Sequence, residues 1–344
     1  MNKIVFLDRK TLGDDITLDQ FDKFGEILSY DSTTPVQTIV RLKHCSIVIT
    51  NKVVIDKNVM DNSNLKLICV AATGMNNIDL EYAKMKNIVV KNVAGYSTAS
   101  VAQLTFSFAL EFVQKLSYYD NYVKSGGWEN SKIFTNLDKP FYELTGKTWG
   151  IIGLGSIGKS VAKIADAFGC KVQYYSTTGA NNDTNYSMCT LDELLKSSDI
   201  ISIHAPLNDK TMNLINKQNI KDIKPGSIVL NLGRGGIVNE QDITDAINSN
   251  QDIYYGTDVV TKEPILKESP LLTINNKERV LTPSQNDSFE RAVALSEGNT
   301  FGGGTSNILL MEIRDALVSQ DRDIYMDSEK VNSSLKRSND RRLG

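Results

Sequence analysis

The sequence predicts an α/β fold with two Rossmann-like domains, each containing a doubly wound parallel sheet. Short apolar runs alternate with segments of helical periodicity along most of the 344 residues, as expected for βαβ units. A glycine-rich turn at residues 153–158 lies between an apolar run and a helical segment, which is typical of a nucleotide-binding unit. The length suits two domains of roughly 100–200 residues each.

The first part of the chain predicts an α/β unit followed by a long helix. Strands are expected at the apolar runs 3–7, 46–50, 67–71 and 88–92, and helices at 34–43 and 79–86. Apolar residues then recur at helical spacing over residues 98–125, which predicts a single helix. A polar arm follows over residues 126–147.

The second part of the chain repeats the alternation of strand and helix. Strands are expected at 147–153, 171–175, 200–204, 227–231, 252–258 and 279–281, and helices at 157–168, 191–196 and 240–249. These segments predict a complete doubly wound sheet that is inserted between the N-terminal unit and the C-terminal residues.

The composition changes after Pro283. Residues 299–307 have the composition of a flexible linker, and residues 308–318 predict one amphipathic helix. Residues 319–344 form a polar tail that we expect to be disordered. A basic cluster in this tail leaves a nucleic-acid arm as a poorly supported alternative; it contains Lys336, Arg337, Arg341 and Arg342.

Composition and charge exclude several classes of function. The net charge of −3 provides no basic field for nucleic acid or an anionic membrane. No apolar run approaches the ~18 residues of a membrane span, and the N-terminus does not resemble a signal peptide. The four cysteines lack disulfide or metal spacing, so we expect reduced thiols in a cytoplasmic protein; they are Cys45, Cys69, Cys170 and Cys189. With only His44 and His204, the chain is poorly equipped for zinc chemistry, and we expect no metal site.

Residues 153–158 have the sequence G-L-G-S-I-G and predict a dinucleotide site. Gly153 permits a tight turn, Gly155 lets the backbone approach a pyrophosphate, and Gly158 lets the helix pack against the strand. The helix N-terminus then offers free N–H groups to the phosphates. Ser176 stands where an acidic residue would bind the ribose of NAD, and no arginine or lysine that could bind the 2′-phosphate of NADP follows before Asp183. We therefore expect NAD as the cofactor, with NADP as the alternative.

Several further motifs resemble those of the D-isomer-specific 2-hydroxyacid dehydrogenases. Residues 231–240 read N-L-G-R-G-G-I-V-N-E, which is similar to the family signature, and matching segments occur at 204–207, 256–259 and 263–264. In the N-terminal part, residues 70–79 resemble the loop that binds the substrate carboxylate, and 93–97 resemble the crossover between domains. The resemblance extends to about residue 283. It is strongest to the glycerate dehydrogenase, or hydroxypyruvate reductase, branch.

The resemblance implies a domain division and a homodimer. A substrate domain with a flavodoxin-like fold would comprise residues 1–98 and roughly 289–318, and an NAD(P)-binding domain would comprise 99–288. The residues implied for cofactor binding are Gly153, Gly155, Ser156, Ile157, Gly158, Ser176, Thr177, His204, Ala205, Pro206, Asn231, Leu232, Gly233 and Asp258. The long helix and the arm that follows it offer aromatic interface candidates, with packing inside one chain as the alternative; these are Trp128, Phe134, Phe141 and Tyr142.

The family's reaction is hydride transfer between NAD(P)H and a small 2-keto acid such as hydroxypyruvate or glyoxylate. Arginine suits this substrate, since its planar fork of donors can hold a carboxylate and polarise a carbonyl. We expect this role for Arg234, whose alternative is an ion pair with Glu240. The resemblance implies further carboxylate contacts from the loop that contains Ala72, Thr73 and Gly74.

The family's proton donor is missing from this sequence. In the family a glutamate, here Glu263, raises the pKa of a histidine that gives a proton to the substrate oxygen. Ser284 stands at the histidine position in the segment L-T-P-S-Q-N. The sequence thus predicts a reductase of weak or lost activity. A dinucleotide-binding regulatory protein on the same scaffold is the second interpretation, and an altered reading frame after the Pro283 codon is a third.

Overall fold

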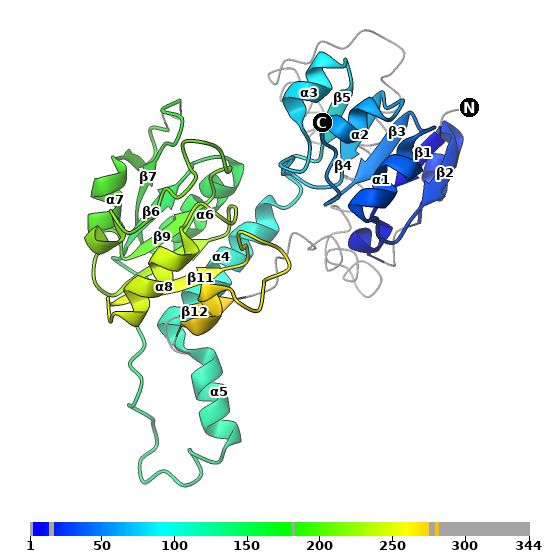
Figure 1. Cartoon of the computed structure of the whole chain (residues 1–344). Coiled ribbons are helices and arrows are strands. Elements are labelled where there is room, and N and C mark those ends of the chain that lie inside the picture. Colours follow the sequence, from blue (N-terminus) through cyan, green and yellow to red (C-terminus); the bar gives the residue numbers. More distant parts are fainter. Residues whose placement is uncertain (1–2, 14–16, 181–182, 275–278, 282–344) are drawn as a thin grey trace, which may run out of the picture. The chain divides into compact units, whose positions relative to one another are not determined.

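The computed structural model describes residues 3–13, 17–180, 183–274 and 279–281. The chain divides into two compact units, one of which ends at Ala94 while the other begins at Gly95 (Figure 1). The expected linker, the helix at 308–318, the basic tail, the C-terminal part of the substrate domain and Ser284 all lie outside the described residues.

The first unit contains a five-stranded parallel sheet with the strand order β2-β1-β3-β4-β5, which is the flavodoxin-like order. Its strands are β1 Lys3–Phe6, β2 Glu26–Ser29, β3 Ile47–Thr50, β4 Leu67–Val70 and β5 Val89–Asn92. Its helices are α1 Pro35–Leu42, α2 Lys57–Asp61 and α3 Leu80–Met85, with short 3-10 turns at Arg9–Leu12 and Asp19–Phe24. The sequence missed β2, because this short edge strand is only half-buried and shows no clear alternation.

The second unit contains a seven-stranded parallel sheet with the order β12-β11-β10-β9-β6-β7-β8. Its strands are β6 Thr148–Ile152, β7 Lys171–Tyr175, β8 Ser187–Met188, β9 Ile200–Ile203, β10 Ser227–Asn231, β11 Ile253–Thr257 and β12 Arg279–Leu281. The order reverses between β6 and β9, as in dinucleotide-binding sheets. The α/β prediction of two parallel sheets is therefore confirmed.

Helices cover both faces of the seven-stranded sheet (Figure 1). They are α4 Thr98–Gln114, α6 Ser156–Ala167, α7 Leu191–Ser197 and α8 Glu240–Asn248, with 3-10 turns at Ile220–Asp222 and Pro270–Thr273. Ile151 packs in one buried cluster with α4 and α6, whereas its neighbour Ile152 packs in the other with α7 and α8. This alternation along β6 shows why its residues are apolar on both faces.

The prediction of one helix over residues 98–125 is wrong. Helix α4 ends at Gln114, and a second helix, α5, spans Leu116–Lys124. Lys115 joins them in the left-handed region, with φ +54°. The backbone N–H of Tyr142 donates to the Val113 carbonyl oxygen (3.0 Å), so the returning chain packs against the end of α4. The apolar spacing continues through Leu116 and therefore gave no sign of the break.

Two sequence expectations about cysteines and membrane segments can be compared with the structure. All four cysteines are free, and three of them are buried. Burial raises the pKa of the Cys69 thiol to about 12 and that of Cys170 to about 11, which favours the protonated form. Among the described residues no helix is long and apolar enough to cross a membrane.

Candidate active site

The three glycines of the phosphate loop have different structural roles. Gly153 has φ +93°, and a Cβ atom there would lie 2.9 Å from the backbone nitrogen of Ala205. A Cβ on Gly158 would lie 2.3 Å from the Gly153 carbonyl oxygen. Gly155 is exposed, and a Cβ there would meet nothing within 4 Å. The first and third glycines thus permit close packing within the chain, while the second leaves open space in front of the backbone.

Helix α6 begins in this open space. Gly155 is its N-cap residue, no side chain of the described residues caps its first turn, and Ser156 is exposed. The first N–H groups of a helix have no partner within the helix and lie at the positive end of its dipole. The loop can therefore hold an anionic phosphate group through backbone N–H groups.

The hydroxyl groups that we expect to bind the ribose lie at the end of β7, which is the second strand of the second unit in chain order. Ser176 follows β7 directly, and its Oγ atom is buried without a hydrogen-bond partner in the part of the chain that the structure describes. Thr177 is half-buried beside it. Asp183 lies further along and forms an ion pair with Lys159 on α6, with 3.0 Å between the charged atoms. A hydroxyl can donate or accept, so Ser176 suits the ribose of either dinucleotide.

His204 lies directly after β9, at the point where the strand order reverses. Its backbone N–H donates to the Ile152 carbonyl oxygen (2.8 Å), which ties it to the strand that leads into the phosphate loop. Both ring nitrogens are buried, and no described residue forms a hydrogen bond with them. Burial lowers the pKa of this imidazole to about 3, so the ring is neutral near pH 7.

Unpartnered polar atoms gather at one edge of the sheet. Ser176, His204 and Asp258 follow β7, β9 and β11, and each has a buried polar atom with no partner in the described protein. The carboxyl ends of parallel strands lie at the same edge, where open α/β sheets bind their ligands. Buried polar groups are normally hydrogen-bonded, so these atoms fit the polar groups of a dinucleotide cofactor.

The loop after β10 is folded by Asn231 and displays Arg234. The Asn231 side chain accepts from the Gly233 N–H (3.2 Å) and donates to the Arg234 carbonyl oxygen (2.9 Å). The Arg234 guanidinium donates to the Gly233 carbonyl oxygen (2.8 Å). Glu240 instead accepts from the backbone and hydroxyl of Thr261, at 2.5 and 2.8 Å. The described residues thus contain no ion pair between Arg234 and Glu240.

The loop after β11 lies in close contact with the loop after β10, which carries Arg234. A Cβ atom on Gly235 would lie only 2.0 Å from the Val260 carbonyl oxygen, so only glycine lets these two loops approach. Asp258 is buried in this region, with 6% of its surface exposed. The pKa of Asp258 is raised to about 7, mainly by burial; a backbone hydrogen bond lowers it, the negative charge of Glu263 raises it, and Arg234 lowers it. Arg234, Asp258 and Glu263 therefore form one electrostatic cluster.

In the first unit, the loop after β4 presents two free backbone donors. Ala72 accepts a hydrogen bond from the Val93 N–H (3.1 Å), and the Thr73 hydroxyl donates to the Val93 carbonyl oxygen (3.0 Å). Asn92 holds the loop from the other side by donating to the Thr73 carbonyl oxygen (2.7 Å). The N–H groups of Thr73 and Gly74 have no acceptor among the described residues. Such a loop can bind a carboxylate.

The comparisons with known proteins agree with this geometry. A family model described as "D-isomer specific 2-hydroxyacid dehydrogenase, NAD binding domain" matches residues 106–284. The chain belongs to this family. A hydroxypyruvate reductase of Blautia hydrogenotrophica is 38% identical over 288 residues, which cover 82% of this chain and 89% of the relative. A glycerate dehydrogenase of Methylorubrum extorquens is 34% identical over 82% of this chain and 88% of the relative.

A solved structure extends the likeness to the fold of this dehydrogenase. An acyclic imino acid reductase (Bsp5), in complex with NADPH and D-Arg, matches with a TM-score of 0.78 at 25% identity. The match covers 92% of this chain and 96% of that chain. The family and the branch that the sequence motifs indicated are thus confirmed.

Sequence reasoning missed the residues that hold this dehydrogenase's loops in place. The Thr257 hydroxyl, buried at the end of β11, donates to the carbonyl oxygens of Asn231 (2.9 Å) and Val259 (2.7 Å). Asn92 plays a similar part in the first unit. A polar residue at the end of an apolar strand was the available signal in both cases, but its partners are distant in sequence.

Proposed function

We propose that this dehydrogenase uses NAD(H) to reduce a small 2-keto acid, hydroxypyruvate, glyoxylate or similar, to the D-2-hydroxy acid. The observation that carries the proposal is the cluster of Arg234, Asp258 and Glu263 in the loops after β10 and β11, at the sheet edge where the side chains of Ser176 and His204 are buried without a partner among the described residues. The names of the curated relatives support this substrate class. NADP is the second candidate cofactor, because the hydroxyls after β7 suit either ribose.

Each group has a task in such a reaction. The bound nicotinamide would supply the hydride. Arg234 would hold the carboxylate and polarise the carbonyl, since its guanidinium is engaged by one backbone oxygen and keeps other donors for a ligand. In the first unit, the backbone of Ala72, Thr73 and Gly74 is proposed to bind a substrate carboxylate.

We expect the reaction to be slow. A serine hydroxyl at the family's histidine position cannot act as an acid near pH 7, and loss of general acid catalysis typically costs ~10²–10⁴ in rate. The alternative is a protein that binds a dinucleotide for regulation and performs no turnover. The two functions differ only in the chemical step, so cofactor binding alone does not distinguish them.

The experiment measures NADH binding by fluorescence and NADH oxidation with hydroxypyruvate or glyoxylate, with reactions lacking the keto acid as controls. We expect binding together with turnover well below the ~10 s⁻¹ of a median enzyme. Binding without oxidation of NADH by either keto acid would favour the regulatory function. Turnover of tens per second would contradict the loss of reaction rate that we expect from Ser284 at the histidine position.

We also propose that the chain forms a homodimer through α5 and residues 125–142, here called the α5 arm. Helix α5 has no buried residue, and Figure 1 shows it lying beyond the end of its own sheet. The returning segment is fixed to the helix: Trp128 Nε1 donates to the Phe134 carbonyl oxygen (3.0 Å), and the Tyr119 hydroxyl donates to the Lys139 carbonyl oxygen. The arm is therefore organised before any partner binds.

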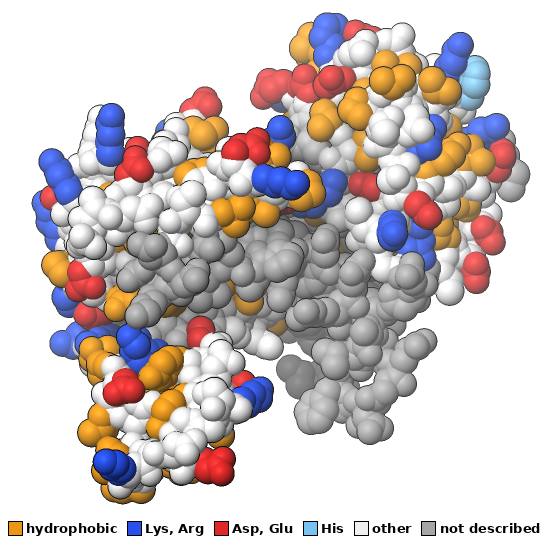
Figure 2. Space-filling model, turned by 60° about the horizontal axis from the view of Figure 1, so that its bottom comes forward, with side chains coloured by type: hydrophobic (Ala, Val, Ile, Leu, Met, Phe, Trp, Pro, Cys, Tyr) orange, Lys and Arg blue, Asp and Glu red, His pale blue; other side chains and the backbone are white. Residues whose placement is uncertain are grey.

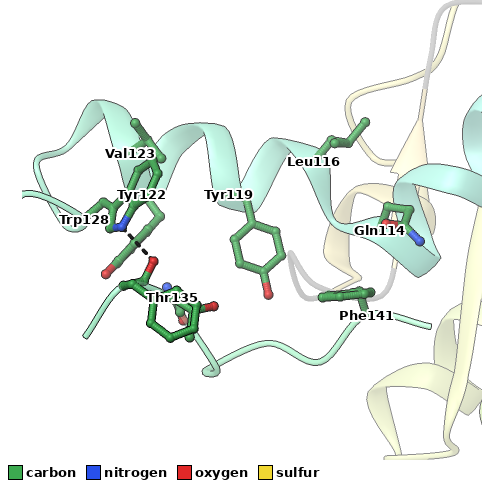
Figure 3. Close-up of a pocket in the computed structure, with 10 residues that line it drawn as sticks. Gln114, Leu116, Tyr119, Tyr122, Val123, Trp128, Thr135 and Phe141 are labelled. Carbon is green, nitrogen blue, oxygen red and sulfur yellow. Dashed lines mark hydrogen bonds between the residues drawn. The ribbon is translucent and has the colours of Figure 1, made fainter. Parts of the chain in front are cut away.

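The inner side of the α5 arm forms an apolar groove of about 360 Å³. Figure 3 shows Tyr119 pointing from α5 toward the returning segment that carries Thr135 and Phe141. Packing within the chain thus explains Tyr119, but Phe134 remains 88% exposed and Phe141 61% exposed. Figure 2 shows hydrophobic side chains spread over this projecting part of the second unit.

The exposed surface of the α5 arm is large enough for a second copy. Its apolar side chains that are about half or more exposed are Leu116, Val123, Trp128, Ile133, Phe134, Leu137, Phe141 and Tyr142. With roughly 150–250 Å² for each aromatic side chain, they leave on the order of 800 Å² uncovered. A stable interface buries about this area on each partner, which supports a symmetric dimer.

A further inference from the structure

The loops around Arg234 contain no imidazolium that could protonate a reduced carbonyl oxygen. The loop after β10, residues 232–239, and the loop after β11, residues 258–269, include no histidine. The chain has only two histidines. His204 is buried and neutral near pH 7, because burial lowers its pKa to about 3, and His44 belongs to the first unit. A substrate that needs no proton at this step would therefore suit the site better than a carbonyl.

The two loops bring charges of opposite sign into one region. A Cβ atom on Gly235 would lie 2.0 Å from the Val260 carbonyl oxygen and 2.5 Å from the Thr261 nitrogen, so the loops are in direct contact. Arg234 precedes this contact in one loop, and Glu263 follows it by two residues in the other. A ligand held by Arg234 is thus exposed to the negative charge of the loop after β11.

This negative charge favours one kind of reacting group over another. Glu240 is engaged in the fold, because it accepts from the Thr261 N–H and hydroxyl at 2.5 and 2.8 Å. Glu263 is exposed on the same loop as Thr261. A carboxylate without a neighbouring imidazolium opposes the negative charge that develops on a carbonyl oxygen, whereas it attracts a cationic nitrogen. An anionic carboxylate beside a cationic group matches the charges of Arg234 and Glu263.

We propose that this dehydrogenase also reduces 2-iminium acids, which a 2-keto acid forms with ammonium or a primary amine, to 2-amino acids. The inference rests on the proposed function, because it uses the same hydride transfer and the same carboxylate contact with Arg234. The iminium nitrogen already carries its proton, so its reduction does not require the missing acid. Glu263 selects the cationic iminium from its mixture with the anionic keto acid.

The atoms and charges of this reaction balance without a general acid in the hydride step. The amine nitrogen forms the C=N bond, and the carbonyl oxygen leaves as water. When the carbon gains the hydride, the C=N π electrons pass to nitrogen and leave a neutral amine, which then takes a proton from water. In a keto acid the same electrons would form an alkoxide, a much stronger base that must be protonated as it forms.

The first experiment measures NADH oxidation by the parent chain with glyoxylate, in methylammonium or in trimethylammonium chloride at equal pH and ionic strength. Both cations carry one charge, but trimethylamine cannot form an iminium by losing water. We expect oxidation to be about tenfold faster or more with methylammonium, since the cost of the missing acid is avoided. Mass spectrometry should identify N-methylglycine as the product. Reactions without protein measure the uncatalysed rate.

The second experiment compares Glu263→Gln with Glu268→Gln, a matched control because Glu268 is also exposed on the loop after β11. Glu263→Gln should raise the KM for methylammonium about fivefold, as expected for the loss of one exposed charge pair. Its kcat should not fall, because the hydride step neutralises the nitrogen. Reduction of glyoxylate without amine should not become slower. A merely structural fault would instead lower kcat and NADH affinity together.

The outcomes separate this activity from the proposed function. Equal rates in the two ammonium salts, or glycolate as the product in both, would overturn the reduction of iminium acids and leave the keto-acid reductase in place. A parent that binds NADH but oxidises it under neither condition would contradict hydride transfer itself. A KM for methylammonium that Glu263→Gln leaves unchanged would remove Glu263 from the recognition of the cationic nitrogen.

Discussion

Arg234 is held by its own main chain, and no carboxylate among the described residues forms an ion pair with it. The guanidinium bonds to the Gly233 carbonyl oxygen, and the turn beneath it is fixed by Asn231. The charge of Asp258 acts on the same region, although burial keeps much of that carboxyl protonated near pH 7. An arginine without a full counter-charge in a partly buried loop is well suited to an anionic substrate.

We therefore expect Arg234→Lys to lower kcat/KM for the keto acid by at least ~10²-fold, about 2.7 kcal/mol of transition-state stabilisation. Lysine keeps the charge but cannot present two parallel donors. The measurement is steady-state NADH oxidation over a range of keto-acid concentrations. NADH affinity serves as the internal control and should stay unchanged, since the phosphate loop lies on other strands. An unaltered kcat/KM would remove Arg234 from the proposed site.

The sequence indicated candidate residues for the site but not their protonation states. The motif around Arg234 and the segment with Asp258 and Glu263 indicated a shared site, and the structure brings their charges together. The protonation of Asp258 could not be foreseen, because it depends on burial beneath loops that are distant in sequence. The same holds for His204, whose neutral state follows from the packing around it.

At the scale of elements, long-range contacts decided what the sequence could predict. Strand β10 was predicted with its observed bounds, since it is a largely apolar run that is buried along its whole length. The predicted first residues of α6 and α8 lie close to the observed ones, because α6 begins at the glycine loop and α8 begins after its N-cap residue Asn239. The break at Lys115 was missed, because the contact between Val113 and Tyr142 that accompanies it joins distant residues.

The phosphate loop allows a prediction in which two glycines respond differently. A valine at position 155 would point into open space and should leave the fold intact, but it would occupy the path of a pyrophosphate. At position 158 even a Cβ atom would collide with the Gly153 carbonyl oxygen at 2.3 Å. We expect Gly155→Val to abolish NADH binding with little change in Tm, and Gly158→Val to lower Tm by several degrees. Fluorescence titration and thermal unfolding check both, and unchanged NADH affinity in Gly155→Val would refute the placement of the cofactor.

At the scale of the whole molecule, the α5 arm is the feature that one copy of the chain leaves unexplained. Its backbone is held by hydrogen bonds such as that from Gln114 to the Tyr142 carbonyl oxygen (3.1 Å), yet its aromatic side chains stay exposed. Such a surface is costly in water unless it binds another surface. A second α5 arm offers matching apolar groups, and a twofold axis would bury both at once.

We therefore expect the parent chain to sediment as a dimer at micromolar concentration and Phe134→Glu to sediment as a monomer. Phe134 is 88% exposed, so a glutamate there costs the monomer little but places a charge in the proposed interface. Met85→Glu is the matched control, because Met85 is 76% exposed at the end of α3 in the first unit; it should remain dimeric. Circular dichroism and NADH affinity should be the same for all three proteins. A monomeric parent, or a dimeric Phe134→Glu variant, would show that the exposed aromatics of the α5 arm do not join two copies.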